Sequence, residues 1–414
     1  MKIVHFADLH IGVENYGTID AETGLSSRLN DFLAVFDELV DYSITQSVDL
    51  VILAGDVYKA RDPSQTHQRE FAKRLSRLSA HSIPTFVVVG NHDLPNSTNR
   101  ATAVEIFPTL HVDDVYIGDN LQTTLIKTHS SPIQIISLPW PRKGTILSRD
   151  ETRGLNIDEV RLELEKRLTR GIEIQADKLD SSIPAILVGH VTVNGATVGS
   201  ERSMMMGNDH ILNVSSLQFP AIDYVALGHI HKHQIVRQGP PMVVYAGSLE
   251  RVDFSEEHDE KGFCVIELDP NQTSGTRVTK FEFKPVKARR FLTIDVEVEP
   301  NTLDPTNHIV NSITKLSIDG AIVRLRVKIP STLYGLIDDR IIRNSMSDAQ
   351  YIANITYDVV SERRPSLQLS PSDGITPEKA LNSYIKNKDS IKDFETEFLE
   401  AALDVIKTVN DQTL

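Results

Sequence analysis

Five short segments of this sequence place metal-binding or acid–base side chains at the end of an apolar run. They read Asp8-Leu9-His10, Gly55-Asp56, Gly90-Asn91-His92-Asp93, Gly189-His190 and Gly228-His229-Ile230-His231. Each preceding run is short and rich in branched aliphatic residues, which predicts a buried strand. Ligands of open α/β sheets bind just outside the carboxyl ends of the strands. We therefore expect these side chains to meet at one edge of the fold.

The side chains at these five ends form a ligand set for two divalent ions. We assign Asp8, His10, Asp56 and His231 to one ion, and Asp56, Asn91, His190 and His229 to the other, with Asp56 bridging. Two ions about 3.5–4 Å apart suit phosphoester cleavage, because they bind the phosphate and activate a shared water. Imidazole mixed with carboxylate favours manganese, iron or zinc over magnesium or calcium. Each motif alone is compatible with an ordinary polar turn, and only their joint order indicates a metal site.

His92 is expected to act differently from the ligands. It directly follows the candidate ligand Asn91, so its side chain should point elsewhere, toward the bound phosphate. There it would protonate the leaving oxygen as a general acid, or stabilise negative charge. Asp93 is the group we expect to orient it. His5 lies inside the first strand, and we expect it to be a packing residue.

The bulk composition limits the class of protein. The 414 residues predict two or three domains, and the net charge of −14 argues against a passive nucleic-acid-binding module. That charge does not exclude an enzyme whose metals neutralise local carboxylates. Cys264 is the single cysteine, so disulfides and a cysteine zinc site are excluded. We find no signal-peptide core and no run that approaches a membrane span, and expect a cytoplasmic protein without membrane contact.

Strands and helices alternate over residues 1–284, which predicts an α/β sandwich with helices expected at 29–43, 65–80 and 158–170. Residues 285–364 change to half-exposed strand patterns and one helix, a small α+β capping domain. Residues 365–375 are rich in proline and serine and predict a linker. Residues 376–414 show helical spacing and predict a helical tail.

The order D-x-H, GD, GNHD, GH and GHxH resembles the calcineurin-like metallophosphoesterases over roughly the first 250 residues. The resemblance implies two mixed sheets packed face to face and flanked by helices, with a two-metal mechanism. It also implies that the seven ligands are those assigned above and that His92 is the mechanistic histidine. A protein phosphatase or cyclic-nucleotide phosphodiesterase on this scaffold is the alternative enzyme, and a binding protein without catalysis is a third possibility.

Two segments, HVTVNGATVGSERSMMMG and VVYAGSLERVDFSEEHDEKGFCVIEL, are similar to the SbcD family of nuclease subunits of the SbcCD double-strand-break repair complex. This likeness implies manganese-dependent 3′-to-5′ exonuclease activity on duplex DNA, and endonuclease activity on single strands, hairpins or blocked ends. It implies a homodimer bound to a dimeric coiled-coil ATPase. One departure is Lys59 in GDVYK, where relatives often carry His or Asp.

Four further contacts are predicted with an ordinary alternative for each. Lys59 meets a DNA phosphate or is a solvated loop lysine. One strand face carries Arg324, Arg326 and Lys328, which either follow the DNA backbone or simply face solvent. The tail stripe with Ile391, Phe394 and Phe398 either docks on the ATPase or folds back on the catalytic domain. Helical segments at 66–78 and 100–110, with Val104 and Phe107, either pair across a two-fold axis or cover the sheet.

Overall fold

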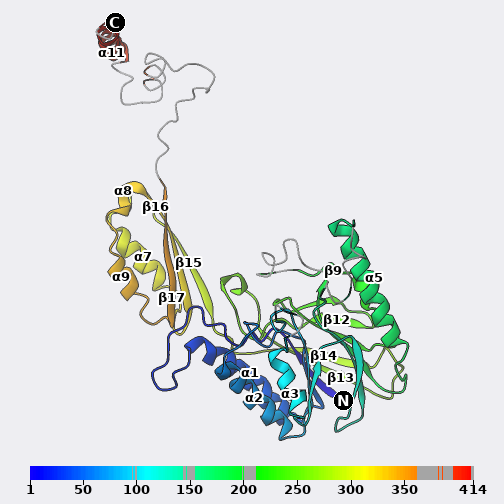
Figure 1. Ribbon diagram of the computed structural model, residues 1–414. Coiled ribbons are helices and arrows are strands. Elements are labelled where there is room, and N and C mark those ends of the chain that lie inside the picture. Colours follow the sequence, from blue (N-terminus) through cyan, green and yellow to red (C-terminus); the bar gives the residue numbers. More distant parts are fainter. Residues whose placement is uncertain are drawn as a thin grey trace. The chain divides into compact units, whose positions relative to one another are not determined.

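Two six-stranded mixed sheets pack face to face, and helices cover both outer faces (Figure 1). The structure is a computed structural model, and it describes residues 1–95, 97, 100–142, 146, 154–197, 199, 211–360, 381, 385 and 395–411. This architecture confirms the predicted α/β sandwich. The strands that precede the candidate ligands all belong to the two large sheets.

The first sheet contains the three N-terminal strands that the sequence predicted. Its order is β14 (Val278–Pro285), β13 (Gly262–Leu268), β1 (Lys2–Phe6), β2 (Leu50–Leu53), β3 (Thr85–Val88) and β4 (Val115–Gly118). Strands β1 to β4 are parallel, whereas β13 is antiparallel to β1. Strands β2 and β3 are buried along their whole length, which explains their uninterrupted apolar sequence.

The second sheet has the order β11 (Gln234–Arg237), β12 (Met242–Tyr245), β10 (Tyr224–Gly228), β7 (Ala185–His190), β6 (Ile133–Leu138) and β5 (Gln122–Ile126). Its four central strands are parallel, and the two edge strands are antiparallel to their neighbours. Strands β7 and β10 are therefore adjacent and point the same way. The residues at their carboxyl ends are the ones expected to bind metal.

The main core lies between the sheets. Ile52, Val88, Ile135 and Val188 are fully buried there, together with the inner faces of β10 and β12. On the outside, α1 (Ser27–Thr45) and α2 (Gln65–Ser79) cover the first sheet, and α5 (Ile157–Ala176) covers the second. Each helix contains most of the range predicted for it, because an apolar stripe at helical spacing faces the sheet.

Short elements connect these layers. They are the helices η1 (Ala103–Glu105), α3 (Ile106–Thr109), η2 (Val214–Leu217) and η3 (Phe254–Glu256), and the strands β8 (Thr192–Val193) and β9 (Ile211–Leu212). Across the described ranges, no helix combines the length and the apolar character that crossing a bilayer requires.

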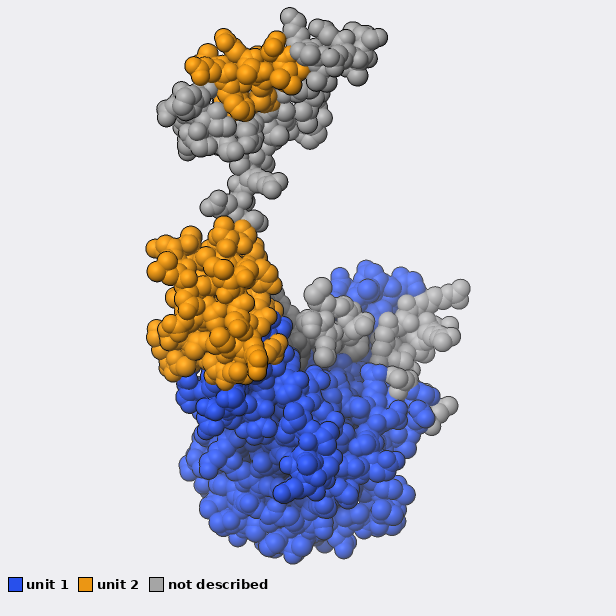
Figure 2. Space-filling view, turned by 90° about the vertical axis from the view of Figure 1, so that its left-hand side faces the viewer, with its two compact units in different colours: residues 1–294, 316–325, 346–355 blue, residues 295–315, 326–345, 356–414 orange. Residues whose placement is uncertain are grey.

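A three-stranded sheet follows, in the order β15 (Phe291–Glu297), β16 (Ile322–Pro330) and β17 (Tyr351–Val360). It carries helices α7 (Pro305–Ile313), α8 (Ser331–Tyr334) and α9 (Asp339–Asn344), and α11 (Glu395–Asp411) closes the described chain. Two compact units result, one of residues 1–294, 316–325 and 346–355, the other of 295–315, 326–345 and 356–414 (Figure 2). The predicted linker, 365–375, lies outside the described residues, and the predicted domain limits stay predictions.

Candidate metal centre

The carboxyl ends of the central strands of both sheets meet, as the sequence predicted. The backbone N–H of Asp8 donates to the Gly55 carbonyl over 3.0 Å, and that of His10 donates to the Asp56 carbonyl over 3.1 Å. The turns after β1 and β2 therefore run side by side. The second sheet joins them through His190, whose Nδ1 lies 2.7 Å from the Ala54 carbonyl oxygen.

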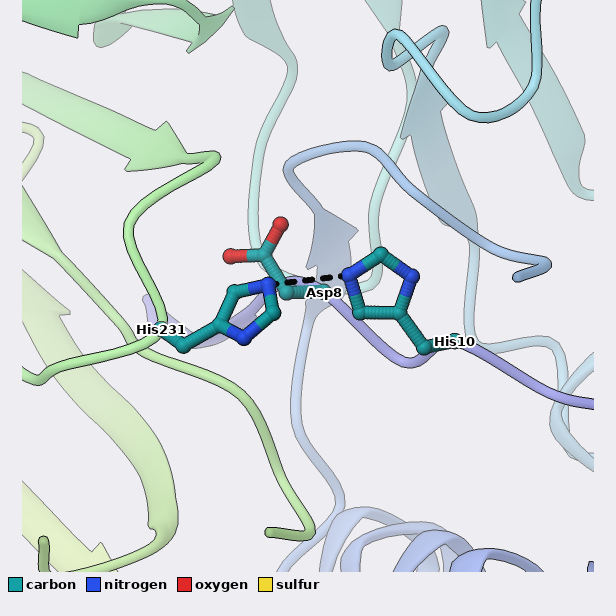
Figure 3. A group of neighbouring side chains, drawn as sticks. All are labelled: Asp8, His10 and His231. Carbon is teal, nitrogen blue, oxygen red and sulfur yellow. Dashed lines mark hydrogen bonds between the residues drawn. The ribbon is translucent and has the colours of Figure 1, made fainter. Parts of the chain in front are cut away.

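One group of ligand atoms gathers around His10 and His231. Their Nε2 atoms lie 2.9 Å apart, and Asp8 lies beside them (Figure 3). The Oδ2 atom of Asp56 is 3.7 Å from the His10 Nε2. Two ring nitrogens at this distance can share one proton, and a cation bound by both lone pairs could take its place. All of these side chains are buried, and the donor set fits a divalent ion.

A second group gathers around His190. Its Nε2 lies 3.4 Å from the Asp56 Oδ2 and 3.0 Å from the Asn91 Oδ1. The same Asn91 oxygen is 3.2 Å from the His229 Nδ1. Asp56 Oδ2 thus reaches both groups, which is the position that a bridging ligand requires. Asp8 also comes within ligand distance of Asp56 and His190, a second contact that the sequence did not predict.

The backbone at these positions is strained. Asp8, His10, Asp56 and His229 all have positive φ, at 52°, 45°, 54° and 96°. Such conformations cost about 1–3 kcal/mol each in residues other than glycine, and they cluster at functional sites. The ligand atoms of Asp8 and His10 lie within 4.8 Å of one another and of His231, and those of Asp8 and Asp56 lie equally close to one another and to His190.

The glycines before the ligands are explained by close packing. A Cβ on Gly55 would lie 2.2 Å from the His190 Nδ1, and the φ of Gly55 is +92°. A Cβ on Gly90 would lie 2.2 Å from the Asp56 Oδ1. Any side chain at either position would therefore displace a candidate ligand.

Burial and charge act together on the protonation of the cluster. Burial raises the pKa of Asp8 to about 6, although His190 and His231 oppose the rise. Burial also acts to raise the pKa of Asp56, but the charge and hydrogen bond of His190 hold it well below its usual range. Burial acts to lower the pKa of His190, but the negative charge of Asp56 outweighs burial and raises this pKa to about 9. A bound cation would replace the His190 proton as the charge that neutralises Asp56.

Comparison with known proteins agrees with this geometry. Residues 1–233 match the family of calcineurin-like phosphoesterases. The chain belongs to that family. Two curated relatives are named as subunits of the nuclease SbcCD. The one from Staphylococcus epidermidis is 26% identical over 71% of this chain and 72% of its own length. The one from Bacillus subtilis is 25% identical over 66% of this chain and 67% of its own length. Among solved structures, a dimetal phosphatase from Danio rerio aligns with a TM-score of 0.37 and 12% identity, over 64% of this chain and 92% of its own.

In this phosphoesterase, His92 lies beside the first ligand group without joining it. Its ring packs edge to face on His10, with centroids 5.0 Å apart, and its Nδ1 donates to the Lys59 carbonyl over 2.9 Å. Its backbone N–H donates to the Asp56 Oδ1 over 2.8 Å. Burial lowers the pKa of His92; Asp56 opposes this, and Lys59 adds to it. Among the described residues, the His92 Nε2 has no hydrogen-bond partner.

The prediction that Asp93 orients His92 is wrong. The buried Asp93 carboxylate accepts from the backbone N–H groups of Gly90 and Val57 over 3.0 Å each, and of Tyr58 over 3.3 Å. It fastens the turn after β3 to the turn after β2. The carbonyl of Lys59 orients His92 instead. Sequence spacing could not reveal this, because a backbone atom of a neighbouring turn supplies the partner.

The side chain of Lys59 lies close to the centre. Its charge lowers the pKa values of both His10 and His92, whose shifts are dominated by burial. Within the described part of the chain, its ammonium makes no hydrogen bond or ion pair. A cation in this position suits an anionic substrate.

Two buried groups behind His231 were not predicted. Glu256 on η3 lies 2.7 Å from the His231 Nδ1, and the Lys261 Nζ lies 2.8 Å from the other Glu256 oxygen. Burial acts to raise the pKa of Glu256, but Lys261 and then His231 hold it well below its usual range. A carboxylate behind a ligating imidazole fixes its tautomer and strengthens the metal bond. The only signal in the sequence was the SEEHDEKG segment, which shows neither strand nor helix spacing.

The other predicted residues have different surroundings. Arg324 lies over the Phe254 ring at 4.3 Å. Arg326 pairs with Asp295 at 2.7 Å and Lys328 with Glu297 at 2.6 Å, so two of the three cations on this face of β16 have acidic partners. Both pairs are exposed and therefore weak, so DNA contact stays a prediction beside the solvent-facing alternative.

The tail and two further histidines complete the comparison. Ile391 and Phe394 lie outside the described residues, whereas Phe398 on α11 is 44% exposed. His5 is a packing residue, as predicted, because it is fully buried against Tyr224 and the Leu227 carbonyl. His233 stacks on Phe283 with centroids 4.0 Å apart, away from the ligand groups.

Proposed function

We propose that this phosphoesterase is a two-metal DNA nuclease of the SbcD type. The observation that carries the proposal is the position of the Asp56 Oδ2, between the Nε2 atoms of His10 and His190 at 3.7 and 3.4 Å. A shared carboxylate between two nitrogen-rich groups is the arrangement that phosphodiester cleavage by two metals needs. The names of the two curated relatives, which are nuclease subunits, support a nucleic acid as the substrate.

The residues that would hold the ions are Asp8, His10, Asp56 and His231 for one, and Asp56, Asn91, His190 and His229 for the other. When bound, two divalent ions, proposed to be Mn²⁺, neutralise the phosphate and lower the pKa of a water. Oxygen and imidazole donors without thiolate suit this ion.

The chain itself handles the proton and the orientation of the substrate. His92 holds its Nδ1 proton on the Lys59 carbonyl, so its Nε2 is the atom that gives a proton to the leaving oxygen. A phosphate beside the ring favours the protonated form, which offsets the effect of burial on its pKa. Lys59 binds a neighbouring phosphate of the same strand. Glu256 keeps the His231 Nε2 free for the metal.

The proposed activities are 3′-to-5′ exonuclease action on duplex DNA and endonuclease action on single strands, hairpins and blocked ends. The test incubates the purified chain and Mn²⁺ with an end-labelled linear duplex, a hairpin, and bis(p-nitrophenyl) phosphate. We expect both DNA substrates to be cut and EDTA to abolish cleavage. Hydrolysis of the chromogenic ester alone would contradict the proposal and favour a phosphatase or small-molecule phosphodiesterase.

The matched variants are Asp56→Asn and His129→Ala. Asp56→Asn should lose most bound metal by elemental analysis and all cleavage, because it removes the shared ligand. His129 is exposed and remote from the ligand groups, so His129→Ala should keep both. Two ions retained by Asp56→Asn would contradict the bridging role.

We further propose a homodimer through helices α2 and α3. Their junction forms an apolar depression of about 410 Å³, beside which Ile106 is 46% and Leu110 is 66% exposed. Val104 and Phe107, the residues predicted at the interface, are 0% and 7% exposed and pack in the core instead. The helical spacing of Val104 and Phe107 therefore marks the side of these helices that packs against the sheet.

The tail is proposed to bind a coiled-coil ATPase. Helix α11 is amphipathic, and Phe398 and Val405 are 44% and 62% exposed. An exposed apolar stripe of this kind suits a helix-in-groove contact. Truncation after Ser370 should leave an active nuclease that no longer captures the ATPase; retained capture would refute the role.

A further inference from the structure

A cavity of about 540 Å³ lies beside the metal centre. Residues after β3, after β6 and on α5 line it, among them Leu94, Trp140, Arg142 and Leu168. Its volume is in the range of sites for small organic molecules, about 300–1,000 Å³. None of the seven candidate ligands lines it, so it is a separate compartment that borders the centre.

Trp140 connects the cavity to the metal centre. Its ring lines the cavity, and its centroid lies 4.8 Å from that of His229 and 6.1 Å from that of His190. The backbone N–H of Trp140 donates to the Val89 carbonyl over 3.0 Å. Prolines on both sides, Pro139 and Pro141, restrict its backbone further. A half-buried indole is therefore held at a fixed place next to a ligand of the second ion.

The cavity wall combines apolar surface with positive charge. Arg100, Arg142 and Arg167 line it, against the acidic Glu105 and Asp119. Both acids are engaged: Glu105 accepts from the Thr102 N–H, and Asp119 accepts from the Asn120 amide.

Two of the three arginines hold weak partners. Arg142 donates to the Pro95 carbonyl over 3.4 Å, and Arg100 pairs with Asp62 at 4.0 Å on the surface. Exposed ion pairs contribute about 0–1 kcal/mol, so a phosphate can replace them at little cost.

We propose that this cavity binds one unpaired nucleotide next to the cleaved phosphate, with its base stacked on Trp140 and its phosphate on Arg142 and Arg100. Aromatic side chains next to arginines are the usual means of holding single-stranded nucleic acid without sequence preference. The inference rests on the proposed nuclease function and specifies it. The enzyme would act where a terminal or looped nucleotide leaves the duplex, because a base that stays paired and stacked offers no free face to the indole.

Trp140 is the only tryptophan of the chain, so its fluorescence reports on this cavity directly. The full-length protein in EDTA is titrated with deoxyadenosine 5′-monophosphate and, separately, with deoxyribose 5-phosphate, which lacks the base. We expect saturable quenching by the nucleotide, with an affinity ten- to a hundredfold above that of the sugar phosphate, because stacking contributes about 1–3 kcal/mol per base. Equal affinities, or no quenching, would overturn the proposal.

Variants separate stacking from general damage to the site. A DNA end that carries 2-aminopurine should be quenched by the wild type and by Trp140→Phe, but not by Trp140→Ala. In calorimetric titrations, which need no tryptophan, Arg142→Ala should weaken binding of both the nucleotide and the sugar phosphate, whereas Trp140→Ala should weaken binding of the nucleotide alone. Each variant should keep its two metal ions by elemental analysis. Unchanged nucleotide binding by Trp140→Ala would overturn the proposal.

The cleavage assay answers a different question. If the protein cuts DNA with Mn²⁺ but binds the nucleotide and the sugar phosphate with equal affinity, the proposed nucleotide site is refuted and the proposed nuclease activity stands. A protein with base-dependent binding at Trp140 that cuts no DNA supports the nucleotide site and refutes the nuclease.

Discussion

Replacing Glu256 by glutamine should weaken metal binding without touching a ligand. The carboxylate lies between the His231 Nδ1 at 2.7 Å and the Lys261 Nζ at 2.8 Å, and both Glu256 and Lys261 are nearly inaccessible to solvent. Glutamine has the same shape but no charge. Its amide group would also point donor hydrogens at Lys261 or His231, which themselves donate there.

Two separate magnitudes follow from this geometry. Loss of a carboxylate behind a ligating histidine typically lowers metal affinity about 10- to 100-fold. That corresponds to about 1.4–2.7 kcal/mol. Breaking a buried ion pair by removing one partner costs about 3–5 kcal/mol of folding stability. We expect the loss of folding stability to lie near the lower end of the roughly 3–5 kcal/mol range, because the Lys261 ammonium keeps two other partners. It also donates to the His231 carbonyl over 3.0 Å and to the Ser248 hydroxyl over 2.9 Å.

Lys261→Met distinguishes the two effects. It removes the ammonium and leaves the Glu256 carboxylate facing His231. We expect a similar loss of folding stability in urea but a Mn²⁺ affinity within a few fold of the wild type, by calorimetric titration. Glu257→Gln is the matched control, because the Glu257 carboxylate accepts from Thr293 and does not face His231. It should change neither the Mn²⁺ affinity nor the centre.

A Glu256→Gln protein that binds Mn²⁺ within twofold of the wild type would refute this account of His231. So would a Lys261→Met protein that loses affinity as strongly as Glu256→Gln. The first result would mean that the carboxylate only stabilises the fold. The second would mean that the ammonium acts on the metal centre independently of the carboxylate.

Three further outcomes are expected. His92→Ala should keep both metal ions and cut DNA about 10²–10⁴-fold more slowly; loss of metal in elemental analysis would make it a ligand. Burial lowers the pKa of His5 to about 3, so the folded state keeps it neutral while the unfolded state protonates below about 6.5. The stability of the wild type should therefore fall as the pH drops through that range. Between pH 7 and 4.5, His5→Gln should lose about 2.5 kcal/mol less stability than the wild type, measured by urea unfolding. Joint substitution of Ile106 and Leu110 by glutamate should give a monomer with full metal content in size-exclusion chromatography with light scattering; an unchanged dimer would move the interface elsewhere.

The sequence was most informative where a backbone pattern and a side chain coincide. A short buried strand that ends in glycine and then a ligand gives both the place and the direction of a group, and the turns carrying Asp8, Asp56, Asn91, His190 and His229 meet as expected. The helices were recognised for the same reason, since burial against a sheet imposes a period on the sequence.

The features that the sequence did not reveal depend on contacts between distant residues, which leave no periodic pattern in the sequence. Glu256 meets His231 across 25 positions, from the short helix η3 that follows β11 and β12. Asp93 looked like the partner of His92 because it is its neighbour, but its carboxylate turns toward backbone N–H groups instead. Val104 and Phe107 fit a helical pattern, but such a pattern does not distinguish a helix face that packs on the sheet from one that binds a second subunit. Strand β14 was missed because its residues are only partly buried and carry charges, so the strand lacks an apolar run.

The contribution of both sheets to one centre has a consequence for synthesis of the chain. The first three strands of the first sheet are synthesised first and carry Asp8, Asp56 and Asn91. Three of the four candidate histidine ligands follow later in the chain: His190, His229 and His231. Asn91 and His229 are 138 residues apart. At 5–20 residues per second a ribosome needs roughly 7–28 s to bridge that distance. During this time the nascent chain exposes an oxygen-rich half site, which favours hard and abundant cations over the final metal. We therefore expect correct metal loading to be a late event, completed only after the second sheet has left the ribosome and closed on the first.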